Sequence, residues 1–588
     1  MKEELEDKTP NDGDVFDFIV VGAGSAGAVI AARLSEIQNV TVLLIEAGSS
    51  ENYVTDLPLI AMYLQLFETF NWNYKIESSP NYCRAMHNNQ CKMPRGKVMG
   101  GSSVLNFMIE TRGNRQDYDD WAKMGCDGWS WKDVMPIFKK MENFHVQDPI
   151  VDKEYHNTGG PVNIARSPYH TISADAFLQA ARERGFPIID YDGKEQIGYS
   201  YTYATIKNGS RFSSNKAYLY PVKGRPNLFV TKKSIAHKVL INNANRAFGV
   251  SFTKEKKKIK VLARKEVIVC AGAIDSPKLL MLSGIGPANH LNDMNIKIKK
   301  DAPVGKNLMD HITYWGLNFL VNDSITVVTS KIFDFMRNNV VHDYLVKREG
   351  PLTITGGIEA AGFINVDDPT AREGSPNIEL LFAGISVGSD PLAYKSLSIK
   401  SKYYNDYLAN MLNKESFMIM PTLLSPKSRG SVVLKSKDPM EPPLINPNYF
   451  DHPDDMRRLI LGIREALRIS ETRAMQMYDA HLPDNSIPGC QDFLKDSDAY
   501  WECAARTFAS TLYHPSGTCK MGAENDNRAV VGPRLKVIGV NGLRVADASI
   551  MPKIVVGHTN IPTMMIGEKL ARMVKEDWGL IVKDKLTE

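Results

Sequence analysis

A glycine-rich turn between a strand and a helix constrains the fold of this chain more than any other feature. The apolar, β-branched run at 17–21 leads into the sequence GAGSAG at 22–27, and an alanine-rich helical stretch follows at 28–37. A second buried strand is expected at 40–45, and Glu46 closes it nineteen residues after the last glycine of the turn. This order of strand, glycine turn, helix, strand and acid is typical of a dinucleotide-binding unit.

Each part of this unit has a physical role in binding a dinucleotide. Gly22 permits the tight turn, Gly24 lets the backbone approach a pyrophosphate, and Gly27 lets the helix pack on the strand. The amino terminus of the helix then faces the phosphates, and the carboxylate of Glu46 is placed to accept hydrogen bonds from the ribose. The unit predicts a Rossmann-like α/β fold, but by itself it does not separate FAD from NAD.

Two further segments are rich in small residues. The sequence PRGKVMGGSSVLN at 94–106 crowds glycine and serine before an apolar stretch, which favours equally a close approach of backbone to a ligand and a turn without one. At 266–270 a buried strand leads into a second glycine turn at 271–277, then into a helix at 278–282 that ends at 283–286. This second turn can deliver backbone donors to the same nucleotide.

The remaining patterns predict a second lobe packed with the first. Residues 317–383 alternate β-branched and aromatic residues with turn formers, whereas 454–473 carry apolar positions at helical spacing. With 43% apolar and 23% charged residues among 588, the chain can bury a large core, and no repeat or long linker divides it. We therefore expect an α/β fold, α+β overall, in which the dinucleotide lobe is interleaved with a lobe built on a mixed or antiparallel sheet with helices.

Charge and hydropathy exclude several classes of protein. A net charge of +4 is small for this length and leaves no electrostatic footprint for nucleic acid. The dense basic run at 254–260 lies between strand-like segments and favours a solvated hairpin. No run reaches the roughly 18 apolar residues of a membrane-spanning helix, and residues 1–14 lack the features of a secretory signal. The chain as written is therefore expected to be soluble and cytoplasmic.

The seven cysteines leave a second localisation open. They lack paired metal-ligand spacing, so no metal site is expected. Two pairs are close enough in sequence to form small disulfide loops, and two glycan acceptor sequons are present, so an extracellular protein whose signal peptide has been removed is the alternative. The pairs are Cys83 with Cys91 and Cys490 with Cys503, and the sequons begin at Asn208 and Asn322.

Several of these segments together resemble the glucose-methanol-choline (GMC) oxidoreductases, flavoproteins that oxidise alcohols. Residues 96–106 resemble the first signature of the family, and GAIDSPKLLMLSGIG at 272–286 resembles the second. The motifs YHP at 513–515, RVADA at 544–548 and GHTNIP at 557–562 resemble the segments around the flavin. The resemblance extends over about residues 17–574, and within the family the sequence is most similar to the insect glucose dehydrogenase-like branch.

This resemblance implies a division of the chain into three stretches. Residues 15–320 form the N-terminal region of the family, which is mostly the FAD-binding lobe with insertions from the substrate lobe. Residues 321–527 are mostly substrate-binding lobe, and 528–575 return to the FAD lobe; the family's C-terminal region covers about 428–570.

The resemblance also implies FAD-dependent oxidation of an alcohol. His514 is the implied general base, because a neutral imidazole can take a hydroxyl proton as hydride leaves for flavin N5, and His558 is the implied partner that orients the alcohol. Asn560 is expected to cap a helix that has Pro562 in its first turn and whose positive end stabilises negative charge near flavin N1. Leu105 stands where some members attach FAD through a histidine, which predicts a non-covalent flavin.

A larger set of residues is expected to contact FAD. Val98, Asn106 and the Ala236 backbone are included by resemblance, and Asp547 is expected to engage the ribityl or pyrophosphate region. The other histidines, among them His87, His145 and His311, are interpreted as structural or surface residues. The full set is Gly22, Gly24, Ser25, Ala26, Gly27, Glu46, Ala47, Val98, Gly100, Gly101, Ser102, Ser103, Asn106, Ala236, Asp547, Ala548, Asn560 and Pro562.

The electron acceptor and the substrate stay open at this point. A dehydrogenase that passes electrons to a quinone or another acceptor is favoured by the resemblance. The alternatives are an alcohol oxidase that uses O2 and produces H2O2, and a catalytically inactive flavoprotein or binding protein on the same fold. The substrate pocket is expected to draw on 317–420 and on residues beside Tyr513. Glu110, which stands where similar sequences usually carry an aromatic residue, has no explanation from the sequence.

Overall fold

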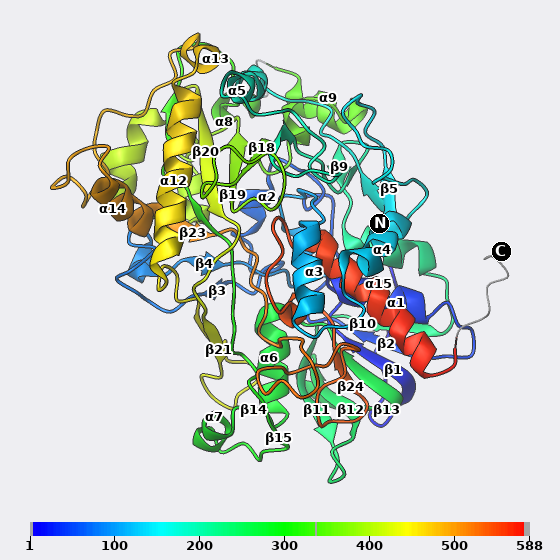
Figure 1. Ribbon diagram of the computed structural model, residues 1–588. Helices are drawn as coiled ribbons and strands as arrows, with labels where there is room; N and C mark the ends of the chain where they lie inside the picture. The colour runs from blue at the N-terminus through cyan, green and yellow to red at the C-terminus, as the bar shows by residue number, and fades with distance from the viewer. Residues whose placement is uncertain (1–3, 335–337, 581–588) are drawn as a thin grey trace.

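Two seven-stranded sheets, one in each half of the molecule, organise the fold (Figure 1). The structure is a computed structural model that describes residues 4–334 and 338–580. The strands of the first sheet are β1 (Val15–Val21), β2 (Val42–Ile45), β10 (Leu228–Thr231), β11 (Ser234–Ile241), β12 (Ala247–Lys254), β13 (Lys257–Val269) and β24 (Leu543–Val545). The strands of the second sheet are β7 (Gly198–Tyr201), β16 (Ile312–Tyr314), β17 (Asn318–Leu320), β18 (Ile358–Ile364), β19 (Ile378–Ala383), β20 (Ser416–Leu423) and β23 (Ala509–Thr511).

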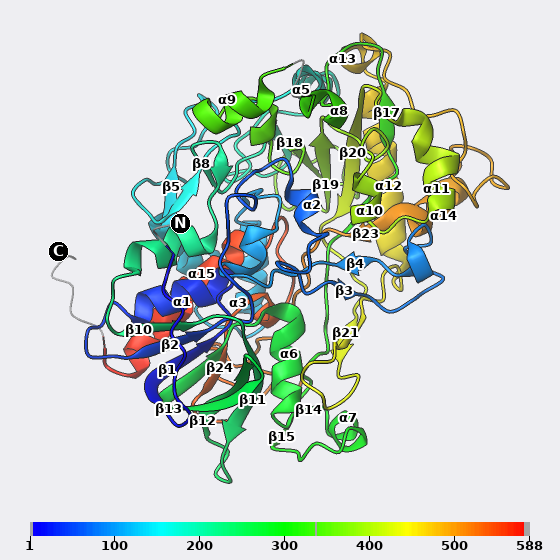
Figure 2. The same ribbon diagram turned by 180° about the vertical axis from the view of Figure 1, so that it is seen from behind.

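The first sheet combines a parallel core with an antiparallel extension. Its order is β10-β2-β1-β13-β12-β11, and β24 pairs with β13 in parallel. Strand β1 lies between β2 and β13 and is parallel to both. Helices α1 (Ser25–Leu34) and α15 (Asn560–Asp577) pack side by side next to this core in both views (Figure 1 and Figure 2). The predicted strand, glycine turn, helix and strand are present, which confirms the Rossmann-like α/β class.

The boundaries of these elements differ from the sequence expectations by a few residues. The helix expected at 28–37 begins at Ser25 and ends at Leu34, and the strand expected at 40–45 begins at Val42. The second glycine turn is shorter than expected, because helix α6 (Gly272–Leu282) begins within it and accommodates Pro277. The basic run at 254–260 does form the hairpin between β12 and β13, as predicted.

The second sheet is antiparallel and is buried on both faces. Its order is β23-β16-β20-β19-β18-β7, and β17 pairs with β20. Strands β18, β19 and β20 are buried along their whole length. Helices α5 (Ile172–Glu183) and α12 (Pro453–Ser470) pack against these strands, as Figure 2 shows for α12 behind β20. A sheet covered on both sides explains why its strands are apolar runs without regular alternation.

The chain crosses between the two sheets several times. The strands of the first sheet come from 15–269 and 543–545, whereas those of the second come from 198–201, 312–423 and 509–511. Strand β7 of the second sheet therefore lies within the stretch 15–320, where insertions from the substrate lobe are expected. The division into 15–320, 321–527 and 528–575 stays a prediction.

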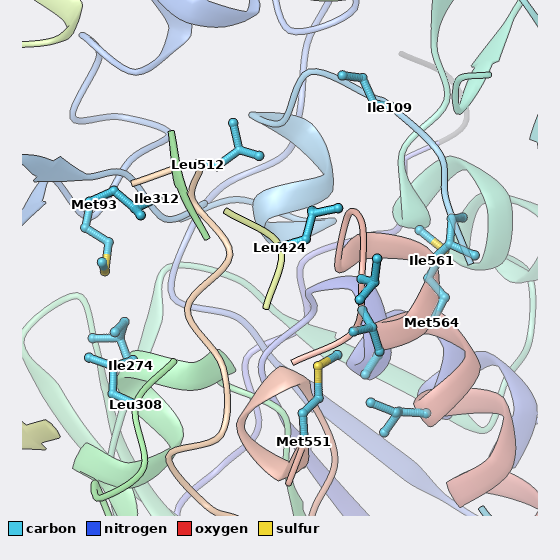
Figure 3. Packing of buried hydrophobic residues seen from close by; sticks show 14 of the residues in the cluster. Met93, Ile109, Ile274, Leu308, Ile312, Leu424, Leu512, Met551, Ile561 and Met564 are labelled. Atoms are coloured by element: carbon cyan, nitrogen blue, oxygen red, sulfur yellow. The ribbon is translucent and has the colours of Figure 1, made fainter. Parts of the chain in front are cut away.

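A continuous buried cluster joins the two lobes. Figure 3 shows part of this cluster, which includes Ile274 of α6 and Leu308, and in which Ile561 and Met564 project from the first turns of α15. Leu512, which follows β23, lies close to Ile312 of β16 in the same view. Because buried side chains pack at crystal-like density, this core holds the elements around the site in fixed positions.

Two further features bear on where the protein works. The structure contains disulfide bonds between Cys83 and Cys91 and between Cys490 and Cys503. None of the helices in the described ranges combines the length and apolar character needed to cross a lipid bilayer.

Candidate active site

Two glycine loops meet at the wall of a cavity of about 220 Å³. Gly101, with a φ of +54°, approaches Gly24 so closely that a Cβ on Gly101 would lie 2.6 Å from the Gly24 Cα. Helix α1 begins directly after Gly24, and within the described residues its N-cap makes no side-chain hydrogen bond to the first N–H groups. Gly24, Ser25, Gly101 and Ser102 all line the cavity. Free N–H groups at a helix amino terminus beside an uncrowded backbone suit a pyrophosphate.

Glu46 lies at the end of β2 and lines the same cavity. Its carboxylate oxygens accept hydrogen bonds from the backbone N–H groups of Ala23 and Gly48, each at 2.8 Å. Burial raises the pKa of Glu46 to about 7. Each carboxylate oxygen has a second lone pair, so the group can also accept hydrogen bonds from ribose hydroxyls, as the sequence predicts.

Asp547 joins the C-terminal strand β24 to the second glycine turn. Its Oδ2 accepts hydrogen bonds from the Gly272 N–H at 2.9 Å and the Ser276 hydroxyl at 2.6 Å, while its Oδ1 accepts one from the Ser549 N–H at 2.8 Å. Asp547 and Gly272 line the cavity. The carboxylate therefore fixes the amino terminus of α6 against the cofactor cleft.

The cavity brings together most of the residues predicted to contact FAD. Two of those that do not line it stabilise the glycine loops. A Cβ on Gly27 would lie 1.8 Å from the Gly22 carbonyl oxygen, and the Ser103 hydroxyl donates to the Gly100 carbonyl at 2.6 Å. The predicted residues that line the cavity are Gly22, Gly24, Ser25, Ala26, Glu46, Ala47, Gly101, Ser102, Asn106, Ala236, Asp547, Ala548 and Asn560, with His514 and His558. The predicted residues outside its lining are Gly27, Val98, Gly100, Ser103 and Pro562.

The expected capping role of Asn560 is wrong. Helix α15 has Thr559 as its N-cap, and Asn560 is the first helical residue. The Asn560 Oδ1 instead accepts a hydrogen bond from the Ser25 hydroxyl at 2.7 Å, which ties α15 to the start of α1. Its Nδ2 is buried and has no hydrogen-bond partner in the part of the chain that the structure describes, and the residue lines the cavity. A buried donor without a partner is costly, so this amide suits an acceptor atom of a bound flavin.

His514 is held in a strained loop directly after β23. Tyr513 adopts a φ of +69°, which is unusual for a residue with a bulky side chain. Two side chains fix this loop: the Arg95 guanidinium donates to the Tyr513 carbonyl at 2.8 Å, and the Asp310 carboxylate accepts from the His514 N–H at 2.9 Å. Strain of this kind persists where the surroundings over-determine the backbone, and it is concentrated at functional sites.

His514 and His558 face each other inside the cavity. Their ring centroids lie 4.9 Å apart, and the rings are nearly perpendicular at 84°. His558 is fixed through its backbone N–H, which donates to the Thr111 hydroxyl at 2.6 Å. The sequence prediction that two histidines more than 40 residues apart meet in one site therefore agrees with the geometry.

A third histidine, His311, belongs to the site although the sequence interpretation set it aside. Its Nε2 lies 3.1 Å from the Leu424 carbonyl, and its Nδ1 lies 3.0 Å from the Nδ1 of His514. Burial, with the nearby His558, lowers the pKa of His311 to about 3, so the ring is neutral at pH 7. The carbonyl can only accept, so Nε2 carries the hydrogen and Nδ1 accepts one from His514. In the neutral His514 ring this leaves Nε2 with a free lone pair.

Glu379 is the second functional residue that sequence reasoning missed. It lies on β19, fully buried, and its Oε1 is 3.2 Å from the Nε2 of His558. Its other carboxylate oxygen has no hydrogen-bond partner among the described residues. A single acid in the otherwise apolar strand IELLFA was the signal that could have marked it.

The structure also accounts for Glu110. This side chain is buried outside the lining of the cavity, next to Asp192, and burial raises its pKa well above the usual value. Asp192 in turn accepts a hydrogen bond from the Arg112 N–H at 2.9 Å. Glu110 therefore belongs to a buried polar cluster rather than to an aromatic contact.

The fold and the site together define a flavin-dependent oxidoreductase, and comparison with known proteins gives the family. A family model described as GMC oxidoreductase matches residues 16–313, and a second one with the same description matches 426–567. The chain belongs to the GMC oxidoreductase family, which confirms the resemblance. It is an FAD-dependent oxidoreductase that acts on CH–OH groups.

Relatives and solved structures cover nearly the whole chain. Over 568 residues it is 38% identical to a Drosophila melanogaster protein named glucose dehydrogenase (FAD, quinone), covering 96% of this chain and 87% of that protein. It is 35% identical over 576 residues to an oxygen-dependent choline dehydrogenase of Rhizobium etli, and the match covers 96% of this chain and 98% of that protein. A formate oxidase crystal structure superposes with a TM-score of 0.83 at 29% identity, covering 97% and 99%. For pyridoxine 4-oxidase from Mesorbium loti the TM-score is 0.79 at 26% identity, covering 95% and 98%.

Proposed function

We propose that His514 is the general base that removes the hydroxyl proton of the alcohol while hydride leaves the carbinol carbon. The observation that carries this proposal is the pair of facing rings of His514 and His558, 4.9 Å apart in the cavity that the two glycine loops also line. FAD supplies the hydride acceptor when it is bound. Positioned bases of this kind contribute about 10²–10⁴-fold to the rate.

His311 prepares His514 for this task. Its Nδ1 accepts the hydrogen on the His514 Nδ1, so the lone pair of His514 Nε2 is available for the substrate proton. Burial also holds the pKa of His514 well below its usual value, with His558 and His311 adding to the effect. The imidazole is therefore neutral at pH 7 before the alcohol binds, which is the state that a base requires.

His558 and Glu379 act as a second pair that positions the alcohol oxygen. Glu379 accepts a hydrogen bond from His558 Nε2, which fixes the ring orientation. The buried carboxylate, on the far side of the His558 ring, also balances the positive charge that appears on His514 when it takes the proton of the alcohol.

The residues that would hold FAD come from both ends of the chain. Glu46 is positioned for the ribose, the start of α1 for the pyrophosphate, and the start of α15 with Asn560 for the flavin. Leu105 lines the cavity and has no nucleophilic atom, which supports non-covalent binding. The flavin is expected to leave the protein on acid precipitation.

The electron acceptor is proposed to be a quinone or a related molecule, by analogy with the named acceptor of the Drosophila melanogaster relative. Reduction of O2 to H2O2 is the alternative, and formate oxidase and pyridoxine 4-oxidase have the same fold. An inactive flavoprotein is disfavoured because both histidines lie in the cavity. Turnover with the same alcohol under air and with a quinone under argon separates the first two.

An oxidising compartment is proposed for the mature protein. The disulfides Cys83–Cys91 and Cys490–Cys503 favour the extracellular alternative over the cytoplasmic one. Asn208 and Asn322, which begin the two sequons, are both exposed and so accessible to glycosylation. A shift in mobility after N-glycosidase treatment of the protein from its native source tests this.

The assignment of the base is tested with His514→Ala. We expect the variant to keep its FAD but to lose at least a hundredfold in the rate of flavin reduction by alcohol under anaerobic conditions, in line with the usual contribution of about 10²–10⁴. The matched control is His342→Ala, because that histidine side chain is 67% exposed in a surface ion pair. Equal reduction rates in the two variants would refute the role of His514.

A further inference from the structure

A second, smaller cavity of about 30 Å³ lies next to the main cavity of the candidate active site. The two cavities share four wall residues, namely Phe107, Trp315, Ile358 and Met420. The ring of Phe107 packs directly on Gly356, since a Cβ there would lie 2.4 Å from the ring. We name this space the side chamber; it adjoins the main cavity at these four residues.

The walls of the side chamber are mostly apolar. Besides the shared residues it is lined by Leu59, Met62, Ala383, Val387, Ala393 and Met418, among others. The one carboxylate at its end, Asp390, is fully satisfied. Its Oδ1 accepts from the N–H groups of Leu392 and Ala393, and its Oδ2 accepts from the hydroxyls of Tyr63 and Thr329.

The main cavity also has an apolar wall. Ile358, Leu381, Met420 and Leu512 form part of this wall. Three of the four residues that it shares with the side chamber carry no polar side-chain atom; the exception is Trp315, with a single indole N–H. A sugar presents many hydroxyls, and each one that is buried without a partner is costly.

We propose that the preferred substrate is an alcohol with an apolar body rather than a polyol, and that the side chamber binds an apolar group attached to that body. This inference rests on the proposed oxidation of an alcohol at His514 and adds its substrate class.

The size of the side chamber limits the group that it accepts. A volume of about 30 Å³ corresponds to roughly two water molecules, or a group of about two or three carbons. Apolar cavities of this kind are poorly hydrated. An apolar group that enters therefore displaces no water with strong hydrogen bonds to the protein.

The test uses a series of primary alcohols from ethanol to heptanol, with glucose and sorbitol as polyols, on the FAD-loaded enzyme. We expect kcat/KM for flavin reduction to rise about fourfold for each methylene that becomes buried, the equivalent of about 0.8 kcal/mol. Glucose and sorbitol are expected to be poorer substrates than the long alkanols. A preference for the polyols, or no dependence on chain length, overturns the proposal.

Variants of the side chamber test where the chain binds. Ala393→Leu fills the space and should lower the ratio of kcat/KM for the long and short alcohols by about tenfold, whereas Met62→Ala enlarges the space and should move the optimum to a longer chain. The matched control is Ala244→Leu in the exposed turn after β11, which should keep the parental profile. If Ala393→Leu does not fold, the shift in Met62→Ala decides; an unchanged optimum there refutes the side chamber.

Binding of alkylamides of the same chain lengths separates this inference from the proposed reaction. These amides have no oxidisable hydroxyl, and their dissociation constants can be read from the perturbation of the flavin absorbance. One outcome would refute the reaction but support the side chamber. In it no alcohol reduces the flavin, the amides bind more tightly as their chains lengthen, and this trend is lost in Ala393→Leu or shifted to longer chains in Met62→Ala. Dissociation constants that do not depend on chain length overturn the side chamber even if alcohols are oxidised.

Discussion

The parts of the candidate site next to the first sheet and next to the second sheet are built by different means. Around the first sheet the site is mainly backbone: at Gly22, Gly27 and Gly101 a Cβ would lie within 3 Å of another backbone atom. Around the second sheet the site is made of side chains, with His311 next to β16, Glu379 on β19 and His514 after β23. A backbone site depends on a few local glycines, whereas a side-chain site depends on the long-range pairing of strands.

The largest effect is expected from a change that breaks the backbone site alone. Gly24 has a φ of −75°, and a Cβ there would meet nothing closer than the Gly101 Cα at 3.9 Å, so the fold should accept a side chain. The branched side chain of Gly24→Val would occupy the gap between the loops. We expect FAD content to fall at least tenfold, a loss of about 1.4 kcal/mol or more, with no measurable turnover.

The measurement is the ratio of flavin to protein absorbance after purification, together with circular dichroism. The matched control is Gly224→Val, since a Cβ at that exposed glycine meets no atom within 4 Å. Full FAD occupancy in Gly24→Val would show that the gap between the loops is not the pyrophosphate site.

The second prediction addresses the side-chain site. Glu379→Gln keeps the shape of the side chain but removes the charge beside His558. Hydrogen bonds to charged groups contribute about 1.5–3 kcal/mol, so we expect flavin reduction to slow by about 10- to 100-fold while FAD stays bound. Stopped-flow reduction under anaerobic conditions measures this.

Glu359→Gln provides the matched control for this second prediction. Glu359 is also a buried acid of the second sheet, but its carboxylate binds the N–H and hydroxyl of Thr171, away from the histidines. We expect Glu359→Gln to lower the stability of the protein but to slow flavin reduction less than Glu379→Gln does. Similar rates of flavin reduction in the two variants would mean that Glu379 has only a structural role.

The contrast between the sheets also explains what the sequence could predict. The first 46 residues contain a complete local unit, so Gly22, Gly24 and Glu46 could be assigned from their spacing alone. The second sheet pairs β7 with β18 and β16 with β23, over separations that no local pattern encodes. His514 and His558 were found only through the family resemblance. Glu379 and His311 were missed because a lone acid or histidine beside a strand is usually structural.

The third prediction concerns the pH dependence of stability, which follows from His311. The folded-state pKa of about 3 lies below the unfolded value near 6.5, so the unfolded chain binds more protons between these values. The contribution of a neutral His311 is thus present above pH 6.5 and is lost as the pH falls. Between pH 7 and pH 5 the loss is about 2 kcal/mol.

Denaturant unfolding of the FAD-loaded protein at the two pH values measures this loss, with His311→Gln as the comparison. The variant has no group that titrates at this position, so its stability should fall by about 2 kcal/mol less than that of the parent over the same interval. An identical pH dependence in both proteins would mean that His311 is solvated or already protonated in the folded state.

The smallest effect is expected at the contact that joins the two kinds of site. The Ser25 hydroxyl, at the start of α1, donates to the Asn560 Oδ1 at the start of α15, and this contact fixes the amide whose Nδ2 has no hydrogen-bond partner among the described residues. Ser25→Ala removes one neutral hydrogen bond, which contributes about 0.5–1.5 kcal/mol, so FAD affinity should weaken by about two- to tenfold. Isothermal titration of the apoprotein with FAD measures the change. If Ser25→Ala slows flavin reduction a hundredfold at full occupancy instead, the Ser25 contact controls catalysis, and the separation between a backbone cofactor site and a side-chain catalytic site breaks down.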